Sequence, residues 1–113
     1  MHEARVAADI LETVERVAAD NFATRITSIR LQIGEFTCVQ PDALQFCLEA
    51  LSEGTIAQDA ALSITRIKTT AVCGECHSEF SVHEIEFRCP MCASTNIELL
   101  SGRELFIESI EVD

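Results

Sequence analysis

The sequence predicts an α+β fold in which a helix, a strand, a second helix and a second strand precede a cysteine-rich module and a final strand. Two observations predict it. Apolar residues recur along the chain first with a helical and then with a strand period, and four of the six cysteines form two Cys-x-x-Cys pairs between residues 73 and 92. The 113 residues are about one domain's length. The cysteine module therefore interrupts an otherwise continuous α+β unit.

The first two elements are an amphipathic helix and a half-buried strand. From residue 6 to residue 19, charged side chains surround an apolar stripe made of Val6, Ile10, Val14 and Val17. Asn21 offers a stop for this helix. Residues 24–33 then alternate between apolar and polar side chains, so that Ile29, Leu31 and Ile33 share one face of a strand that Gly34 ends.

A second helix and two more strands follow. Pro41 suits the first turn of a helix, because no hydrogen bond is lost there, and it precedes an apolar face made of Leu44, Cys47, Leu48 and Leu51. Residues 61–68 are rich in β-branched side chains and predict the second strand. A strand, helix, strand unit favours a parallel pair. Residues 105–112 predict the last strand, and because both of its faces carry apolar residues we expect it at the centre of the sheet.

Charge and hydropathy exclude several classes of function. Eight Lys and Arg against nineteen Asp and Glu give a net charge of −11. Because nucleic-acid binding needs a basic surface, we expect no nucleic-acid partner. The apolar runs are too short for a membrane span, and the sequence starts without a basic segment followed by an apolar one, so we expect a cytoplasmic protein and no membrane partner.

The two cysteine pairs predict a structural zinc site. Cys73 and Cys76, like Cys89 and Cys92, are separated by two residues, a spacing that lets one tight turn aim two sulfurs at one ion. Twelve residues separate the pairs, enough for a short hairpin. Disulfides are disfavoured in a reducing compartment, and a redox role is disfavoured by the second matching pair. Four thiolates leave no open position on Zn(II), so the predicted site holds residues 71–100 together and is not catalytic.

Two histidines keep two interpretations each, and the two remaining cysteines have no predicted metal role. His77 follows the first cysteine pair and His83 lies between the pairs, so each is either a polar surface residue or an exchangeable metal ligand. Cys47 is most simply a small core residue of the second helix, and Cys38 stays unassigned in a loop.

The first three residues, Met1-His2-Glu3, have the chemistry of a nickel site. His2 can chelate a metal through its own backbone nitrogen and Nδ1, and an adjacent ring closes through either the Met1 amine or the Glu3 amide. Such deprotonated amides favour square-planar Ni(II) or Cu(II) over Zn(II). A fourth ligand must come from elsewhere, with His77, His83, Asp42, the Glu3 carboxylate, water or a partner protein as candidates. The alternative is a disordered terminal histidine.

Taken together, several motifs resemble the HypA/HybF family of nickel metallochaperones over essentially the whole chain. They are the initial Met1-His2-Glu3, Gly34-Glu35 with residues 39–44 and Phe46, the two cysteine pairs and the closing stretch 102–107. The resemblance implies a three-stranded mixed sheet with two helices as a nickel-binding domain, residues 1–70 plus 101–113, beside a zinc-ribbon module, residues 71–100. Ala4-Arg5-Val6-Ala7 departs from the family's usual continuation after the third residue, but leaves the predicted ligands intact.

The resemblance also implies a function and partners. The protein would carry transferable Ni(II) to the large subunit of nickel–iron hydrogenase, together with a HypB-type GTPase, and some family members also supply urease maturation. His2 would be the key nickel ligand, and the four cysteines would hold structural Zn(II). The alternative is a zinc-ribbon adaptor between proteins, in which Met1-His2-Glu3 is incidental. An enzyme lacks support, since the sequence shows no recognisable nucleophile–base pair, phosphate loop or open metal site.

Overall fold

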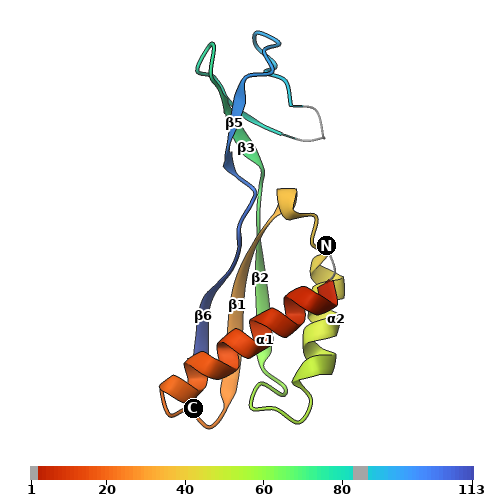
Figure 1. Ribbon diagram of the computed structural model, residues 1–113, viewed down its shortest axis with the longest axis vertical. Coiled ribbons are helices and arrows are strands. Elements are labelled where there is room, and N and C mark those ends of the chain that lie inside the picture. The colour runs from red at the N-terminus through yellow and green to blue at the C-terminus, as the bar shows by residue number, and fades with distance from the viewer. Residues whose placement is uncertain (1–2, 83–86) are drawn as a thin grey trace.

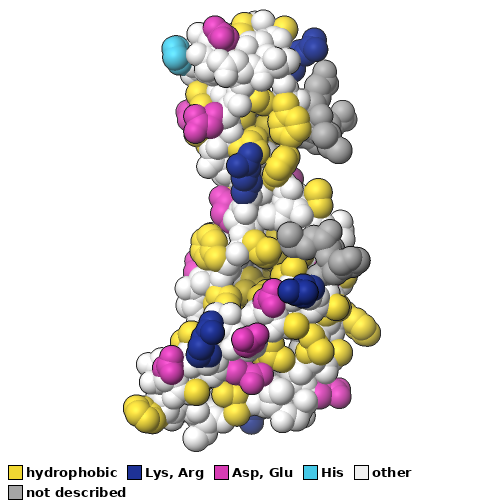
Figure 2. All heavy atoms as spheres, in the orientation of Figure 1, with side chains coloured by type: hydrophobic (Ala, Val, Ile, Leu, Met, Phe, Trp, Pro, Cys, Tyr) yellow, Lys and Arg dark blue, Asp and Glu magenta, His cyan; other side chains and the backbone are white. Residues whose placement is uncertain are grey.

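The computed structural model describes residues 3–82 and 87–113. The molecule is elongated, with principal extents of 55 × 24 × 17 Å. A lower part contains both helices and one sheet, and an upper part contains a second sheet with the cysteines (Figure 1). The space-filling view shows a narrow waist between the two parts (Figure 2).

The lower part is a mixed three-stranded sheet with helix α1 lying across one of its faces (Figure 1). Its strands stand in the order β2-β1-β6, and β1 pairs parallel with β2 and antiparallel with β6. This arrangement confirms the predicted α+β fold and the predicted parallel pair. The elements are α1 (Glu3–Asp20), β1 (Ile26–Gly34), a short 3₁₀ turn η1 (Glu35–Thr37), α2 (Pro41–Ser52), β2 (Ala61–Ile67) and β6 (Leu105–Val112).

The core forms where α1 and α2 pack against each other and against the sheet. Pro41 occupies the first turn of α2 as predicted. Two residues of the apolar helix faces, Val17 and Leu51, are nevertheless 42% and 43% exposed. Ala18 takes the place of Val17, because a step of four residues from Val14 keeps a side chain on the face toward the sheet. The fully buried larger side chains of this core are Val14, Ile26, Leu31, Ile33, Val39 and Leu44.

The prediction that the last strand lies at the centre of the sheet is wrong. β1 is central and β6 lies at an edge. Apolar residues occur on both faces of β6, but Phe106 is 49% exposed, whereas Leu105, Ile107 and Ile110 pack against the core. In this protein, a strand with apolar residues on both faces is therefore a partly exposed edge strand and not a central one.

The upper part is an antiparallel sheet inserted between β2 and β6. Its strands stand in the order β4-β3-β5, and they are β3 (Thr70–Cys73), β4 (Glu79–Ser81) and β5 (Ile97–Ser101). Both β4 and β5 pair with β3. The strands are short, and the buried side chains here are few, with Ala71, Cys73 and Cys89 among them. Such a module needs a cross-link of some kind to be stable.

The waist is formed by the two short connections between the sheets. The Ser101 hydroxyl donates to the Lys68 carbonyl over 2.7 Å and lies 2.6 Å from the Thr70 hydroxyl. Gly102 adopts a φ of +111°, and a Cβ atom on Gly34 would lie 2.0 Å from its carbonyl oxygen. The chain segments thus cross here at a separation that only glycine permits.

No helix within the described part of the chain has the length and apolar character needed to span a membrane.

Candidate metal centre

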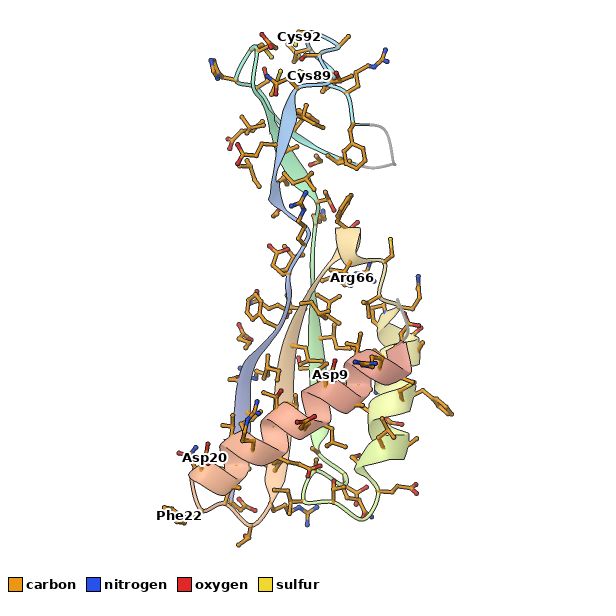
Figure 3. The ribbon with its side chains drawn as sticks, viewed as in Figure 1. Asp9, Asp20, Phe22, Arg66, Cys89 and Cys92 are labelled. Atoms are coloured by element: carbon orange, nitrogen blue, oxygen red, sulfur yellow. The ribbon has the colours of Figure 1, made fainter. Side chains whose placement is uncertain are left out.

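The structure brings the four paired cysteines together at the far end of the upper part (Figure 3). The sulfur atoms of Cys73, Cys76, Cys89 and Cys92 all lie within 4.8 Å of one another. Two of the cross-pair distances, Cys73 to Cys92 and Cys76 to Cys89, are 3.5 Å. In a tetrahedral site with zinc–sulfur bonds of about 2.3 Å, sulfur atoms stand about 3.8 Å apart. The sulfur cluster therefore has the dimensions of a four-thiolate zinc site.

The two cysteine pairs lie in turns with the same backbone hydrogen bonds. In the first turn, the amide of His77 donates to the Cys73 carbonyl and the amide of Cys73 donates to the Ser78 carbonyl. In the second, the amide of Ala93 donates to the Cys89 carbonyl and the amide of Cys89 donates to that of Ser94. His77 and Ala93 both have a φ of 62°. The equivalence means that both pairs present their sulfurs in the same way.

Backbone amides also point at the first sulfur of each turn. The amides of Glu75 and Cys76 lie 3.3 and 3.4 Å from the Cys73 sulfur, and the Met91 amide lies 3.4 Å from that of Cys89. Hydrogen bonds of this kind favour the thiolate over the thiol. Cys73 and Cys89 are buried, whereas the second cysteine of each turn is exposed.

The thiols do not ionise equally. The amide of Cys76 and that of Glu75 lower the pKa of Cys73 against the opposing effect of burial. The hydroxyl and amide of Ser78, together with the Cys89 thiol, lower the pKa of Cys76 to about 6. At Cys92 the amide of Ser94 acts in the same direction, but the neighbouring Cys73 sulfur and burial outweigh it and raise the pKa to about 12. Some thiols of the cluster thus ionise readily, and Cys92 ionises only with difficulty beside them.

This donor set suits Zn(II). A divalent cation at the centre would outweigh the hydrogen bonds and burial that hold Cys92 in its thiol form, because a coordinated thiol is deprotonated. Four sulfur ligands complete a tetrahedral site, so no position remains for a substrate or a reactive water. When bound, zinc would supply the cross-link that the short strands of the upper part lack.

The other predicted ligands lie apart from this cluster or outside the described residues. His77 is exposed beside Cys76, while His83 lies outside the described residues. Cys47 is half-buried and packs against the core, as predicted. Cys38 is exposed and ends the 3₁₀ turn with a φ of 61°.

The start of α1 lies against the start of α2. Met1 and His2 lie outside the described residues, but the carboxylate of Glu3 accepts a hydrogen bond of 3.3 Å from the amide of Gln40, the N-cap of α2. Asp42 follows in the first turn of that helix. His77 directly follows Cys76 of the cluster, which lies at the end of the molecule remote from α1 (Figure 3). The structure therefore brings Glu3 near Asp42 and separates it from His77.

Sequence reasoning missed three residues that shape these sites. Ser78 and Ser94 each follow a cysteine pair, in the repeated pattern Cys-x-x-Cys-x-Ser, and this repeat was a visible signal. Gln40 gave no signal, because its contact with Glu3 is made by a backbone amide across 37 positions of the chain.

Comparisons with known proteins agree with this architecture. A family model described as hydrogenase/urease nickel incorporation, metallochaperone, HypA, matches residues 1–112. The hydrogenase maturation factor HypA of Chlorobium limicola is 39% identical over 113 residues, which are 100% of this chain and 97% of that protein. The factor of the same name from Desulfitobacterium hafniense is 34% identical, with 100% of this chain and 99% of that protein covered.

Solved structures match over nearly the full length as well. The solution structure of the nickel metallochaperone HypA from Helicobacter pylori aligns with a TM-score of 0.70 and 26% identity, covering 99% of this chain and 97% of that one. A second solution structure of a HypA protein aligns with a TM-score of 0.73 and 26% identity, covering 99% and 96%. Metallochaperones carry metals and do not transform substrates. Full-length agreement in sequence and fold shows that the chain belongs to the HypA family of hydrogenase/urease nickel-incorporation metallochaperones.

Proposed function

We propose that this metallochaperone binds Ni(II) at its first three residues and releases it by ligand exchange to the maturation machinery. Family membership supports the cargo, and the contact between Glu3 and Gln40 supports the place, since it fixes the start of α1 against α2. A terminal site with one borrowed ligand suits a carrier, because an incoming protein can replace that ligand without unfolding the donor.

His2 is the central ligand of the proposed site. Its imidazole and its own backbone nitrogen close one chelate ring, and the Met1 amine or the Glu3 amide closes the next. Both cannot lie in the same plane as the histidine ring, so the two sets are alternatives. Strong-field amide nitrogens select square-planar Ni(II) over Zn(II), which disfavours zinc at the N-terminus.

The position of Glu3 favours Asp42, water or a partner's side chain as the fourth nickel ligand. The amide of Gln40 holds the Glu3 carboxylate, and Asp42 lies two residues further along. His77 follows Cys76, which clusters with Cys89 and Cys92, and those two cysteines lie at the end of the molecule remote from α1 (Figure 3). His77 would therefore reach a nickel ion at the N-terminus only from a second molecule.

We assign the cysteine cluster to structural Zn(II) and keep the division into two domains as part of the proposal. Residues 1–70 and 101–113 would form the nickel-binding domain, and residues 71–100 the zinc-binding module. The strands of the second sheet, from Thr70 to Ser101, support these limits.

The proposed setting is the cytoplasm, where thiols stay reduced. The implied partners are a HypB-type GTPase and the large subunit of nickel–iron hydrogenase, with urease maturation proteins as further candidates. The hydrogenase/urease description of the family supports this class of partner.

Nickel titration of a His2→Ala variant tests the site. We expect the variant to keep one zinc ion and its fold but to lose the nickel-dependent d–d absorption. His77→Ala serves as the matched control, because it removes a histidine beside the zinc cluster and should leave nickel binding unchanged. Undiminished nickel binding by His2→Ala would contradict the assignment.

Acetylation of the N-terminal amine separates the two ligand sets. If the Met1 amine is a donor, acetylation converts it to an amide and nickel binding weakens. If the amides of His2 and Glu3 are the donors, the affinity stays as it was. Absorption of the complex near the band of square-planar Ni(II) reports the geometry in both cases.

A further inference from the structure

The two edges of the lower sheet are protected to different degrees. Figure 1 shows β6 and β2 on opposite sides of β1. The β1–β6 ladder is interrupted by two register shifts, and β6 carries the charged residues Glu108 and Glu111. Irregular pairing and charge are devices that keep other strands away from an edge. β6 is therefore a protected edge.

β2 lacks these devices over most of its length. It pairs with β1 through seven consecutive residues without a register shift, and Ala61 to Thr65 are uncharged. Within the described residues, no backbone hydrogen bond joins β2 to a segment other than β1. A regular, uncharged edge is the kind to which an extended chain adds as a further strand.

A groove lies beside this edge, between β2, the end of α2 and the loop that connects them. Its volume is about 420 Å³. Its floor is apolar and includes side chains of both helices and two strands, namely Leu11, Ile29, Leu48 and Leu62. A side chain that points from an added strand toward the helices would enter this groove.

The rim of the groove is acidic. Glu49, Glu53 and Asp59 line it together with uncharged residues. No Lys or Arg is among the residues that line the groove, and the two ion pairs within the described residues do not involve these three carboxylates. An apolar floor under an acidic rim fits lysine or arginine, whose methylene stem can cover the floor while the charged end reaches the carboxylates.

We propose that the β2 edge and this groove form the docking site for an extended segment of a partner protein that carries Lys or Arg at alternate positions. The segment adds to the sheet as a fourth strand beside β2, and the basic side chains that lie beside Leu62 and point toward the helices enter the groove. Arg66 and Lys68 stand at the other end of β2, so the basic residues of the partner lie nearest Ala61.

A second copy of this chain is a poorer occupant. Each chain carries a net charge of −11, so two copies repel each other, and the acidic rim would face another acidic protein. The acidic rim attracts a basic segment of a partner protein, whereas it repels a second copy of this acidic chain.

The test uses the full chain without nickel and a synthetic peptide, acetyl-(Thr-Lys)4-amide. On addition of the peptide, we expect the backbone amides of Ala61–Ile67 to exchange more slowly with solvent, while those of Leu105–Val112 keep their rates. Slowing at both edges, or at neither, overturns the proposal. Because no nickel is present, failure of this experiment would count against the docking surface alone and would not count against the proposed nickel site.

Two N-methylated peptides test whether the strand adds through its backbone. In one the threonine amides are methylated, in the other the lysine amides. Alternate amides of a strand point to opposite edges, so one peptide should lose binding and the other keep it. Binding of both would show attraction by charge alone and overturn strand addition.

Charge variants locate the peptide's lysines. The triple variant Glu49→Gln, Glu53→Gln and Asp59→Asn should bind the unmodified peptide about tenfold more weakly. Asparagine is chosen at Asp59 because the φ there is 65°. The matched control, Glu12→Gln, Asp20→Asn and Glu98→Gln, removes the same net charge from exposed positions outside the groove. Equal loss in both variants overturns the site.

Sedimentation of the free protein decides between the two occupants. We expect a species of one chain in which the β2 amides exchange readily. A dimer in which the same amides are already protected overturns the proposal in favour of a second copy.

Discussion

At the scale of single residues, four similar thiols acquire different acidities from their positions. Hydrogen bonds with the side chain and backbone of Ser78 lower the pKa of Cys76 to about 6, whereas contacts with the other sulfurs and burial raise the pKa of Cys92 to about 12. The spacing of the cysteines predicted that the four sulfurs cluster, but the difference between the thiols depends on contacts across the cluster that spacing does not contain.

Alkylation immediately after zinc is removed should reveal this difference as long as the two turns keep their backbone hydrogen bonds. With a pKa of about 6, Cys76 is mostly thiolate at pH 7, so brief treatment with iodoacetamide should label it well before Cys92, which remains a thiol. As the pH falls below about 6, labelling of Cys76 should slow, because its thiolate becomes protonated. Peptide mass spectrometry measures both sites. Equal rates at pH 7 would show that the two turns lose this geometry once zinc leaves.

Gly34 tests the close crossing at the waist. Its φ of −75° is accessible to any residue, but an added Cβ would lie 2.0 Å from the Gly102 carbonyl oxygen. Because backbone cannot move aside as a side chain can, Gly34→Ala should lower the free energy of unfolding by about 3 kcal/mol.

Gly54→Ala is the matched control for that substitution. Gly54 has a φ of +77° and open space around it. Alanine there meets no other atom and only has to adopt an unfavourable left-handed backbone conformation, which should lower the free energy of unfolding by about 1 kcal/mol. Urea unfolding of both zinc-loaded variants gives the comparison. A smaller loss at Gly34 than at Gly54 would mean that the crossing is looser than described.

At the scale of elements, α2 shows how burial differs from apolar character. Leu44 is fully buried under α1 and the sheet, whereas Phe46, larger and more apolar, is 71% exposed. Leu44→Ala should therefore destabilise the protein by about 2–5 kcal/mol, and Phe46→Ala by no more than about 0.5 kcal/mol. Thermal or urea unfolding measures the stability of both variants. If the two substitutions lowered the stability equally, Phe46 would have to make a packing contact that this structure does not show.

Periodicity predicted the existence and type of the helices and long strands, but it was less reliable about their surroundings. Val17 and Leu51 fit the apolar stripes of their helices and are nevertheless exposed at 42% and 43%. A stripe gives the direction of a helix face, while the width of the covered face depends on how closely the neighbouring element packs. For the same reason β6, apolar on both faces, lies at an edge.

At the scale of the whole molecule, two parts of different stability meet at the waist. The lower part has a core of buried aliphatic side chains, whereas the upper part depends on the cysteine cluster. We expect Cys89→Ser to release zinc and to expose the amides of β3, β4 and β5 to hydrogen exchange, while the amides of β1 stay protected. Zinc retained by Cys89→Ser would refute the four-thiolate site.

Acid should have the same effect on the native protein as that substitution. Zinc needs thiolate ligands, so protons compete with it and its affinity falls as the pH falls. Titration toward acid with a zinc-sensitive dye should show release accompanied by loss of order in the upper part alone. Simultaneous unfolding of both parts would argue against the division into two domains.

The sequence by itself determined the order and type of the main elements, the four clustered cysteines and, through the resemblance of its motifs, the HypA family. These features are local in the chain, or lie in short motifs whose spacing fixes their chemistry. Only the tertiary structure decided that β1 is central, that Gln40 holds Glu3, and that one sheet edge opens onto an acid-rimmed groove. Each of these depends on contacts between residues far apart in the sequence, which packing selects and periodicity does not encode.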